Sequence, residues 1–398
     1  MHDDRRSHSQ KSATVPRPPH LEPVTHGADS NTQRYTRRWP RPASYVESRN
    51  PRGSATVTDF PGFPDRPLLI GTRSSPMALV QAGHVADLLE RVVPGLTTRT
   101  VPTTTSGDTW PGSLTQAGGK GLFVKAIDQQ LQRGEIDVAV HCLKDVPGDQ
   151  PLPKGLVIAA TPPRADVHDV LLVPAGSPVN SLADLPAGAT VATSAVRRRA
   201  QLLALRPDLR MVDVRGAVAT RLEKLDGQRG GLEADAMVLA QAGLERLGLT
   251  DRIRCRFPLG EVLPAVGAGV LAVQCRRDDE AVATLLHRID DPRTHAEATA
   301  ERSMLRGLHG HCNSPVAAHC VTGADGQLGL RGTVFTLDGT RTIRAHLHAP
   351  SAAHAAELGT RVCAELLGRG ARAIIDATSA GPAPTGGHPA RGDSGPRQ

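Results

Sequence analysis

Hydrophobic and polar positions along the middle of the chain first predict a strand and then a helix. Residues 68–73 (LLIGTR) form a short apolar run typical of a buried strand. In the segment that follows, apolar residues recur at the spacing i, i+3, i+4 and i+7, which indicates an amphipathic helix. These residues are Val85, Leu88, Leu89 and Val92.

The same alternation continues in two successive runs. The first run adds strands at 98–105 and 137–142 and a helix at 121–134. The second run has strands at 169–174, 190–194, 210–215 and 236–243 and helices at 196–205 and 217–225. Strand–helix alternation implies parallel strands joined by crossover helices. We therefore expect two α/β domains with a ligand-binding cleft between them.

The last third of the chain has a different pattern. Residues 328–335 and 342–350 are predicted strands, beside turn signals at Asp-Gly pairs, and residues 355–370 are a predicted helix. This pattern indicates a small α+β domain. The segment HGHCNSPVAAHC (309–320) is expected on the loop that enters it.

Two end segments lack any hydrophobic period. Residues 1–66 are polar and rich in Pro, Ser, Arg and His, and residues 373–398 are rich in Gly and Pro. Both are predicted to be disordered tails, because such compositions cannot bury enough apolar surface to offset the entropy of ordering.

Composition narrows the possible functions only a little. The formal net charge is +7 over 398 residues, which favours an anionic partner, although much of the excess lies in the N-terminal tail. There is no run of eighteen apolar residues and no apolar stretch near the N-terminus. We therefore expect a cytoplasmic protein that does not span a membrane. In that compartment its six cysteines would remain thiols.

Arginines gather where predicted strands end and the next helices begin. They are Arg73, Arg197, Arg198, Arg199, Arg215 and Arg221, and Thr193 and Ser194 precede the run of three. Such strand ends are the usual anion-binding position in α/β folds, and the guanidinium fork matches a carboxylate or a phosphate. A ligand with several negative groups is the prediction. Solvated charge on helix surfaces is the alternative.

Two further segments carry candidate chemistry. Asp145, beside Lys144, follows a buried strand in HCLKDVP and is a candidate acid/base, or else a turn residue. HGHCNSPVAAHC could hold a metal, a disulfide or one reactive thiol. The paired spacings of a structural zinc site are absent from it.

At this point the chain resembles a known family. Eight segments stand in the order found in hydroxymethylbilane synthase, also called porphobilinogen deaminase, over about residues 67–372. They are GTRSSPMALVQ, GGKGLFVK, HCLKDVP, TSAVRRRAQL, VRGAVATRL, LPAVGAGVLAVQCR, AERSMLRGLHGHC and NSPV. The resemblance implies two α/β domains like periplasmic binding proteins and a small α+β domain with the cofactor cysteine. The predicted domains are 67–165 plus about 262–288, 166–261 and 289–372.

The resemblance also implies an activity. The family joins four porphobilinogen molecules head to tail into hydroxymethylbilane and releases ammonia, as a transferase of porphyrin and haem biosynthesis. A dipyrromethane cofactor would be attached by a thioether to Cys312. The resemblance implies a monomer that binds the small-molecule substrate porphobilinogen, with no nucleic acid, membrane or metal involved.

The implied site residues follow from the same matches. Asp145 and Lys144 are the implied catalytic residues, and Lys120 and Phe123 belong to the implied mobile loop. The residues implied to bind the cofactor, besides Cys312, are Arg73, Ser75, Lys144, Thr193, Ser194, Arg197, Arg198, Arg215 and Arg221.

This sequence departs from the family's usual motifs at several polar positions. The substituted positions are Cys142, Leu143, Ala195, Ala217, Ala219, Ala268 and His311. The charged residues remain while several polar contacts are lost. An alternative hypothesis is therefore a non-catalytic paralogue of the same fold that binds polycarboxylates. Such a protein would not need Cys312.

Overall fold

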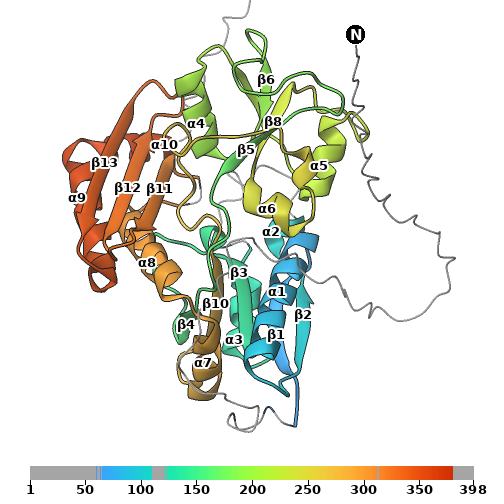
Figure 1. Ribbon diagram of the computed structural model, residues 1–398, viewed down its shortest axis with the longest axis vertical. Coiled ribbons are helices and arrows are strands. Elements are labelled where there is room, and N and C mark those ends of the chain that lie inside the picture. Colours follow the sequence, from blue (N-terminus) through green and yellow to red (C-terminus); the bar gives the residue numbers. More distant parts are fainter. Residues whose placement is uncertain are drawn as a thin grey trace, which may run out of the picture. The chain divides into compact units, whose positions relative to one another are not determined.

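Three β-sheets organise the computed structural model, which describes residues 60, 63, 65–109, 121, 123–311 and 313–379 (Figure 1). Two of the predicted site residues, Lys120 and Cys312, lie outside the described residues. The same holds for most of the two predicted tails.

The first sheet has the strand order β2-β1-β3-β10-β4. Its strands are β1 (Leu68–Arg73), β2 (Thr98–Thr103), β3 (Val138–Cys142), β4 (Leu156–Ala160) and β10 (Leu271–Arg276). The associated helices are α1 (Pro76–Val92), α2 (Ser106–Thr109), α3 (Lys125–Gln132) and α7 (Glu280–Leu286). β1 is parallel to β2 and β3, whereas β10 is antiparallel to β3 and β4.

The second sheet has the order β7-β6-β8-β5-β9. Its strands are β5 (Asp169–Leu172), β6 (Thr190–Ala192), β7 (Arg210–Val212), β8 (Ala236–Ala240) and β9 (Cys255–Arg256). The helices between them are α4 (Val196–Leu205), α5 (Val218–Leu225) and α6 (Gln241–Arg246). β6 is parallel to β7 and β8, and β5 is antiparallel to β8 and β9.

The expectation of parallel sheets is therefore wrong in part, because both α/β sheets are mixed. Each contains a strand that enters from a connection between the two sheets. The chain leaves the first sheet after β4 to begin the second with β5, and it returns from β9 to the first sheet as β10. These two connecting segments give β5 and β10 the opposite direction to their central neighbours.

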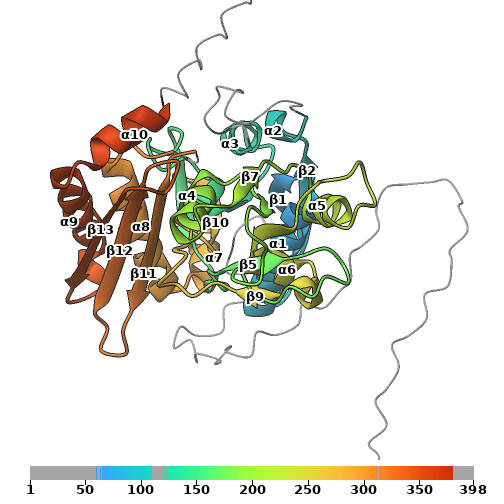
Figure 2. The same ribbon diagram turned by 90° about the horizontal axis from the view of Figure 1, so that it is seen from above.

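The third sheet is antiparallel and has the order β11-β12-β13 (Figure 2). Its strands are β11 (Val316–Thr322), β12 (Leu328–Phe335) and β13 (Thr342–Ala349). Helices α8 (Pro292–Gly307) and α9 (Ala355–Gly368) pack against it, and α10 (Ala371–Ser379) follows. β11 was not predicted, and His319 and Cys320 lie in this strand rather than in the expected loop.

The predicted boundaries of both tails are wrong, because each tail includes residues that belong to the folded part of the chain. Phe60 and Phe63 are buried in the core of the first sheet, and Arg66 donates two hydrogen bonds to Asp137, at 2.7 and 2.9 Å. At the other end, residues 373–379 belong to α10, whose Ile374 and Ile375 are buried against the third sheet. Apolar side chains that reach a core fix these short segments despite their polar surroundings.

Candidate functional site

A cavity of about 600 Å³ is lined by loops and helix ends of both α/β sheets. Most of the predicted site residues that the structure describes line it. They are Arg73, Phe123, Lys144, Asp145, Ser194, Arg197, Arg198 and Arg221. His311 and Asn313, the neighbours of residue 312 on either side, also line the cavity. The segment that enters the third sheet thus meets the cleft of the other two.

Asp145 stands at the carboxyl end of a buried strand. β3 runs directly into a single 3₁₀ turn, Leu143–Asp145, and Leu143 is buried beneath it. The amide of Leu143 donates to the carbonyl of Val270 (3.0 Å), which fixes the turn on the neighbouring chain. Asp145 is half-buried and lines the cavity. It is therefore available to a bound molecule.

Arg73 and Phe123 meet at one side of the cavity. The Arg73 guanidinium lies over the Phe123 ring, 4.1 Å from its centroid, and donates from Nε and Nη2 to Asp108. Burial would raise the pKa of Asp108, but hydrogen bonds from Arg73 and Thr105 hold this pKa below its ordinary value. Asp108 thus remains ionised and orients Arg73. An ionised acid and an aromatic face together present the arginine to the cavity.

Arg197 and Arg198 share one carboxylate that the sequence did not single out. Asp169, the first residue of β5, accepts from Arg197 Nη1 (2.6 Å) and Nη2 (3.2 Å). It also accepts from Arg198 Nη2 (2.7 Å) and Nε (3.0 Å). All three side chains are buried, and the two guanidiniums hold the pKa of Asp169 well below its usual range despite its burial. The group carries one net positive charge beside the cavity.

Arg221, unlike Arg197 and Arg198, is not paired with a carboxylate of the described residues. Its Nε donates to the backbone carbonyl of Gly216 (2.8 Å), and it has no carboxylate partner among the residues that the structure describes. Burial, together with repulsion from Arg198 and Arg215, lowers the pKa of Arg221 to about 10. The second cause is a repulsion between like charges at the site. A ligand that brings carboxylates would relieve it.

Three predicted residues are not among those that line the cavity. Ser75 caps helix α1, where its Oγ accepts from the amide of Ala78 (3.3 Å). Thr193 is buried, and its Oγ1 accepts from the amide of Ala195 (3.2 Å). Arg215 is not among the residues that line the cavity. A role for these three in binding the cofactor stays a prediction.

Two further residues that line the cavity, Gln81 and Arg246, were not predicted from the sequence. Gln81 of α1 donates from Nε2 to Cys142 Sγ (3.0 Å), and Arg246 of α6 donates from Nη2 to the carbonyl of Gly269 (3.0 Å). All of these residues line the cavity. Burial lowers the pKa of Arg246, which the neighbouring Cys142 partly offsets. Helix α6 was not predicted, because residues 236–243 were expected to form one strand, and nothing in the sequence placed Arg246 beside α1.

The cysteines and histidines of HGHCNSPVAAHC do not gather into a metal site within the described residues. No group of three or more His, Cys, Asp or Glu side chains in that part of the chain could hold a metal ion. Cys320 is buried in β11 as a thiol, and burial raises its pKa far above the ordinary value. No described helix is long and apolar enough to cross a membrane.

Comparison with known proteins bears directly on the identity of this cavity. Residues 68–284 match the family model "Porphobilinogen deaminase, dipyromethane cofactor binding domain", and residues 295–368 match the C-terminal domain of porphobilinogen deaminase. The chain belongs to the porphobilinogen deaminase family. Both family models therefore match this chain, and the first is the one for the region that binds the dipyrromethane cofactor.

Curated relatives extend the same match over most of the chain. Porphobilinogen deaminase 2 of Streptomyces coelicolor is 49% identical over 307 residues, which cover 77% of this chain and 96% of the relative. The porphobilinogen deaminase of Syntrophotalea carbinolica is 44% identical, covering 80% of this chain and 98% of the relative. That of Xanthomonas euvesicatoria is 46% identical, covering 77% and 98%.

Proposed function

We propose that this chain is a hydroxymethylbilane synthase, which polymerises four porphobilinogen molecules head to tail into a linear tetrapyrrole and releases ammonia. The observation that carries the proposal is one cavity lined by Asp145, by several arginines and by both neighbours of residue 312. Family membership supports the same reaction. The enzyme is a transferase of tetrapyrrole biosynthesis, and a monomer in the cytoplasm is part of the proposal.

The charge of the cavity fits the dipyrromethane cofactor and the substrate. Each pyrrole unit carries an acetate and a propionate, so every unit that binds brings two negative charges. Arg221 and the net charge of the Arg197–Asp169–Arg198 group supply positive partners for them. These arginines would hold the cofactor, with Cys312 as its covalent anchor. When bound, the cofactor supplies the covalent primer on which the product chain is built.

Asp145 is suited to the proton transfers of the reaction. The amino group of porphobilinogen must carry a proton to leave as ammonia, and the departing electron pair leaves positive charge on the pyrrole. The Asp145 carboxylate can stabilise this charge and take up the ring proton after the new carbon–carbon bond forms. Lys144 is exposed beside it and is proposed to bind a substrate carboxylate.

Three of the residues at which this chain departs from the family's motifs lie in loops or just before helices. Ala195 and Ala217 precede α4 and α5 without a side-chain cap, and the carbonyl of Ala268 accepts from Arg164 Nε (2.9 Å). The loops therefore keep their backbone contacts, although hydroxyl and amide groups are missing. Because the charged residues remain, we propose that the chemistry is retained.

Replacing Asp145 tests the catalytic assignment. We expect Asp145→Asn to lower the kcat for porphobilinogen consumption and ammonia release by roughly 10²- to 10⁴-fold, the usual range for an acid/base residue. Asp213→Asn, at an exposed carboxylate that does not line the cavity, is the matched control and should keep wild-type kcat. Equal turnover by the Asp145 variant and the wild type would remove Asp145 from the mechanism.

A further inference from the structure

A side chain of helix α8 forms hydrogen bonds with the backbone that follows Asp145. The guanidinium of Arg302 donates from Nη1 to the carbonyl of Val146 (3.1 Å) and from Nη2 to the carbonyl of Pro147 (3.0 Å). The two carbonyls are consecutive, so the planar fork of one arginine holds two peptide units at once. A lysine has a single ammonium and would not reproduce this geometry.

The loop after Asp145 has few other backbone contacts. Val146 donates its amide to the carbonyl of Leu143 (3.1 Å), the one backbone–backbone hydrogen bond that residues 146–148 donate to the described part of the chain. Pro147 has no N–H to donate. The direction of the chain immediately after Asp145 therefore depends strongly on Arg302.

The next turn of α8 joins this loop to the one that precedes residue 312. An added Cβ at Gly148 would lie 2.4 Å from Leu305 Cδ2, and one at Gly310 would lie 2.6 Å from Leu305 Cδ1. Leu305 is thus in close contact with both loops, and a larger residue at either glycine would require its side chain to move. Arg302 and Leu305, three residues apart, share one face of the helix.

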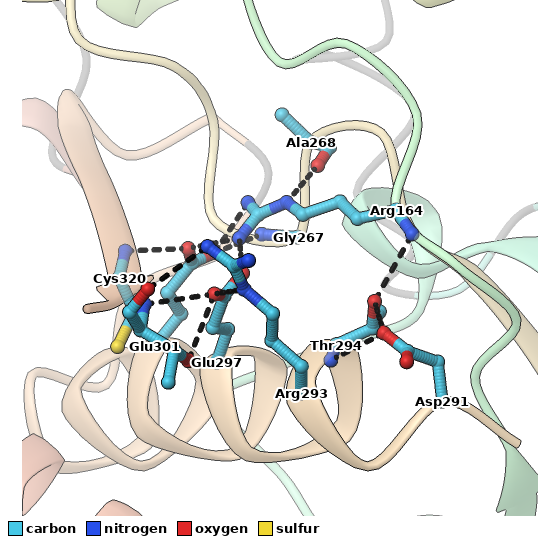
Figure 3. Close-up of polar contacts among 10 residues, drawn as sticks. Arg164, Gly267, Ala268, Asp291, Arg293, Thr294, Glu297, Glu301 and Cys320 are labelled. Carbon is cyan, nitrogen blue, oxygen red and sulfur yellow. Dashed lines mark hydrogen bonds and ion pairs between the residues drawn. The ribbon is translucent and has the colours of Figure 1, made fainter. Parts of the chain in front are cut away.

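The preceding residue anchors α8 to the two segments that connect the α/β sheets. Glu301 is fully buried and accepts from Arg164 Nη1 (2.9 Å), from the amide of Gly267 (2.7 Å) and from the amide of Cys320 (2.9 Å) (Figure 3). Arg164 lies on the segment from β4 to β5, and Gly267 on the return segment to β10. Glu301 therefore holds both connections and strand β11.

Glu297, one turn earlier, reinforces the same cluster. It accepts from Arg164 Nη1 (3.4 Å), Arg293 Nε (3.1 Å) and the amide of Thr322 (2.9 Å) (Figure 3). Multiple charge-assisted contacts in a buried setting make α8 a rigid support. A residue on such a support can hold a reacting group in place.

We propose that Arg302 is a positioning residue for Asp145, fixing through Val146 and Pro147 where the carboxylate stands relative to the loop before residue 312. The inference rests on the proposed function. Arg302 would act on the reaction through this backbone, so its loss should displace Asp145 without changing the affinity for porphobilinogen.

The test compares Arg302→Gln and Arg302→Lys with wild type in steady-state turnover of porphobilinogen at several pH values. Misplacing a reacting group by about 1 Å can cost as much as a hundredfold in rate. We expect the kcat of Arg302→Gln to fall tenfold to a hundredfold with nearly unchanged KM, and its pH profile to shift. The kcat of Arg302→Lys should lie between those of the wild type and Arg302→Gln.

The matched control is Arg306→Gln, at an exposed arginine one turn further along α8. It should keep the wild-type kcat and pH profile. Intact mass and circular dichroism establish that each variant is folded and loaded with cofactor. A wild-type kcat and pH profile in Arg302→Gln, a raised KM as the sole effect, or a loss of cofactor loading would each contradict the proposal. Absence of turnover in the wild type would instead refute the proposed function itself.

Discussion

At the scale of single residues, the arginines of the cavity are of two kinds. Arg197 and Arg198 are buried and divide one carboxylate, Asp169, between them. Arg221 contacts a backbone carbonyl, and its pKa is lowered to about 10 by burial and by neighbouring arginines. The first kind stabilises the fold as well as binding anions. The second kind has no carboxylate partner among the described residues, so a carboxylate of a bound molecule can pair with it.

Asp169 should accordingly be important for stability. Removing the charge of one partner from a buried ion pair costs about 3–5 kcal/mol, and here two guanidiniums would remain buried. We expect Asp169→Asn to lower the free energy of unfolding by about that amount in urea at neutral pH. The control Asp213→Asn, whose pair with Arg199 is exposed, should change it by less than about 1 kcal/mol.

The loss of unfolding free energy in Asp169→Asn should also depend on pH. The pKa of Asp169 is lower in the folded chain than in the unfolded chain, because Arg197 and Arg198 stabilise its ionised form. Its contribution to stability is therefore complete above the ordinary carboxyl pKa, near 4, and is lost as the pH falls toward the lower folded value. The gap between wild type and variant should narrow below about pH 4. A gap that is constant with pH would mean that Asp169 acts by packing alone.

Several residues that line the cavity stand at strand ends and were candidates from the sequence, whereas residues that packing places there were not. Arg73, Asp145 and the arginine run were identifiable because the carboxyl ends of strands in one sheet lie together. Asp169 was predicted as the first residue of a strand and was not singled out as a site residue. Its role depends on α4, which follows much later in the chain.

At the scale of elements, strong hydrophobic periods predicted most helices and strands, and short or doubly buried segments escaped. β11 is buried on both faces over its first five residues, so it shows no alternation of polar and apolar positions. α10 is a short helix whose buried Ile374 and Ile375 are adjacent in a polar surrounding. The direction of β5 and β10 could not be predicted from the local pattern of apolar and polar residues either. It depends on how the chain crosses from one sheet to the other.

Truncation distinguishes α10 from the tail that was expected there. Removing residues 371–398 takes away Ile374 and Ile375, each worth roughly 1.5–3 kcal/mol when fully buried. We expect this truncation to lower the thermal midpoint clearly. A chain that ends at residue 379 is the control and should unfold at the wild-type temperature. Equal midpoints for the two truncated chains would show that α10 adds nothing to the fold.

At the scale of the whole molecule, the candidate site draws on each of the three sheets. The first contributes Arg73 and Asp145, the second Arg197, Arg198 and Arg221, and the loop before the third contributes His311 and Asn313. The cluster around Glu301 joins the connections between the first two sheets to β11 of the third. The family match likewise spans two domains, 68–284 and 295–368. The proposed activity therefore requires the assembled chain.

The most direct test of this account is the intact mass of the purified protein beside that of Cys312→Ser. A loaded synthase should carry the added mass of two linked pyrrole units in the wild type and no added mass in the variant. Circular dichroism of both proteins establishes that they are folded. The contrary result is a folded wild type that has the bare chain mass and stays unmodified after incubation with porphobilinogen. That result would indicate a paralogue that keeps the anion-binding cavity without the chemistry.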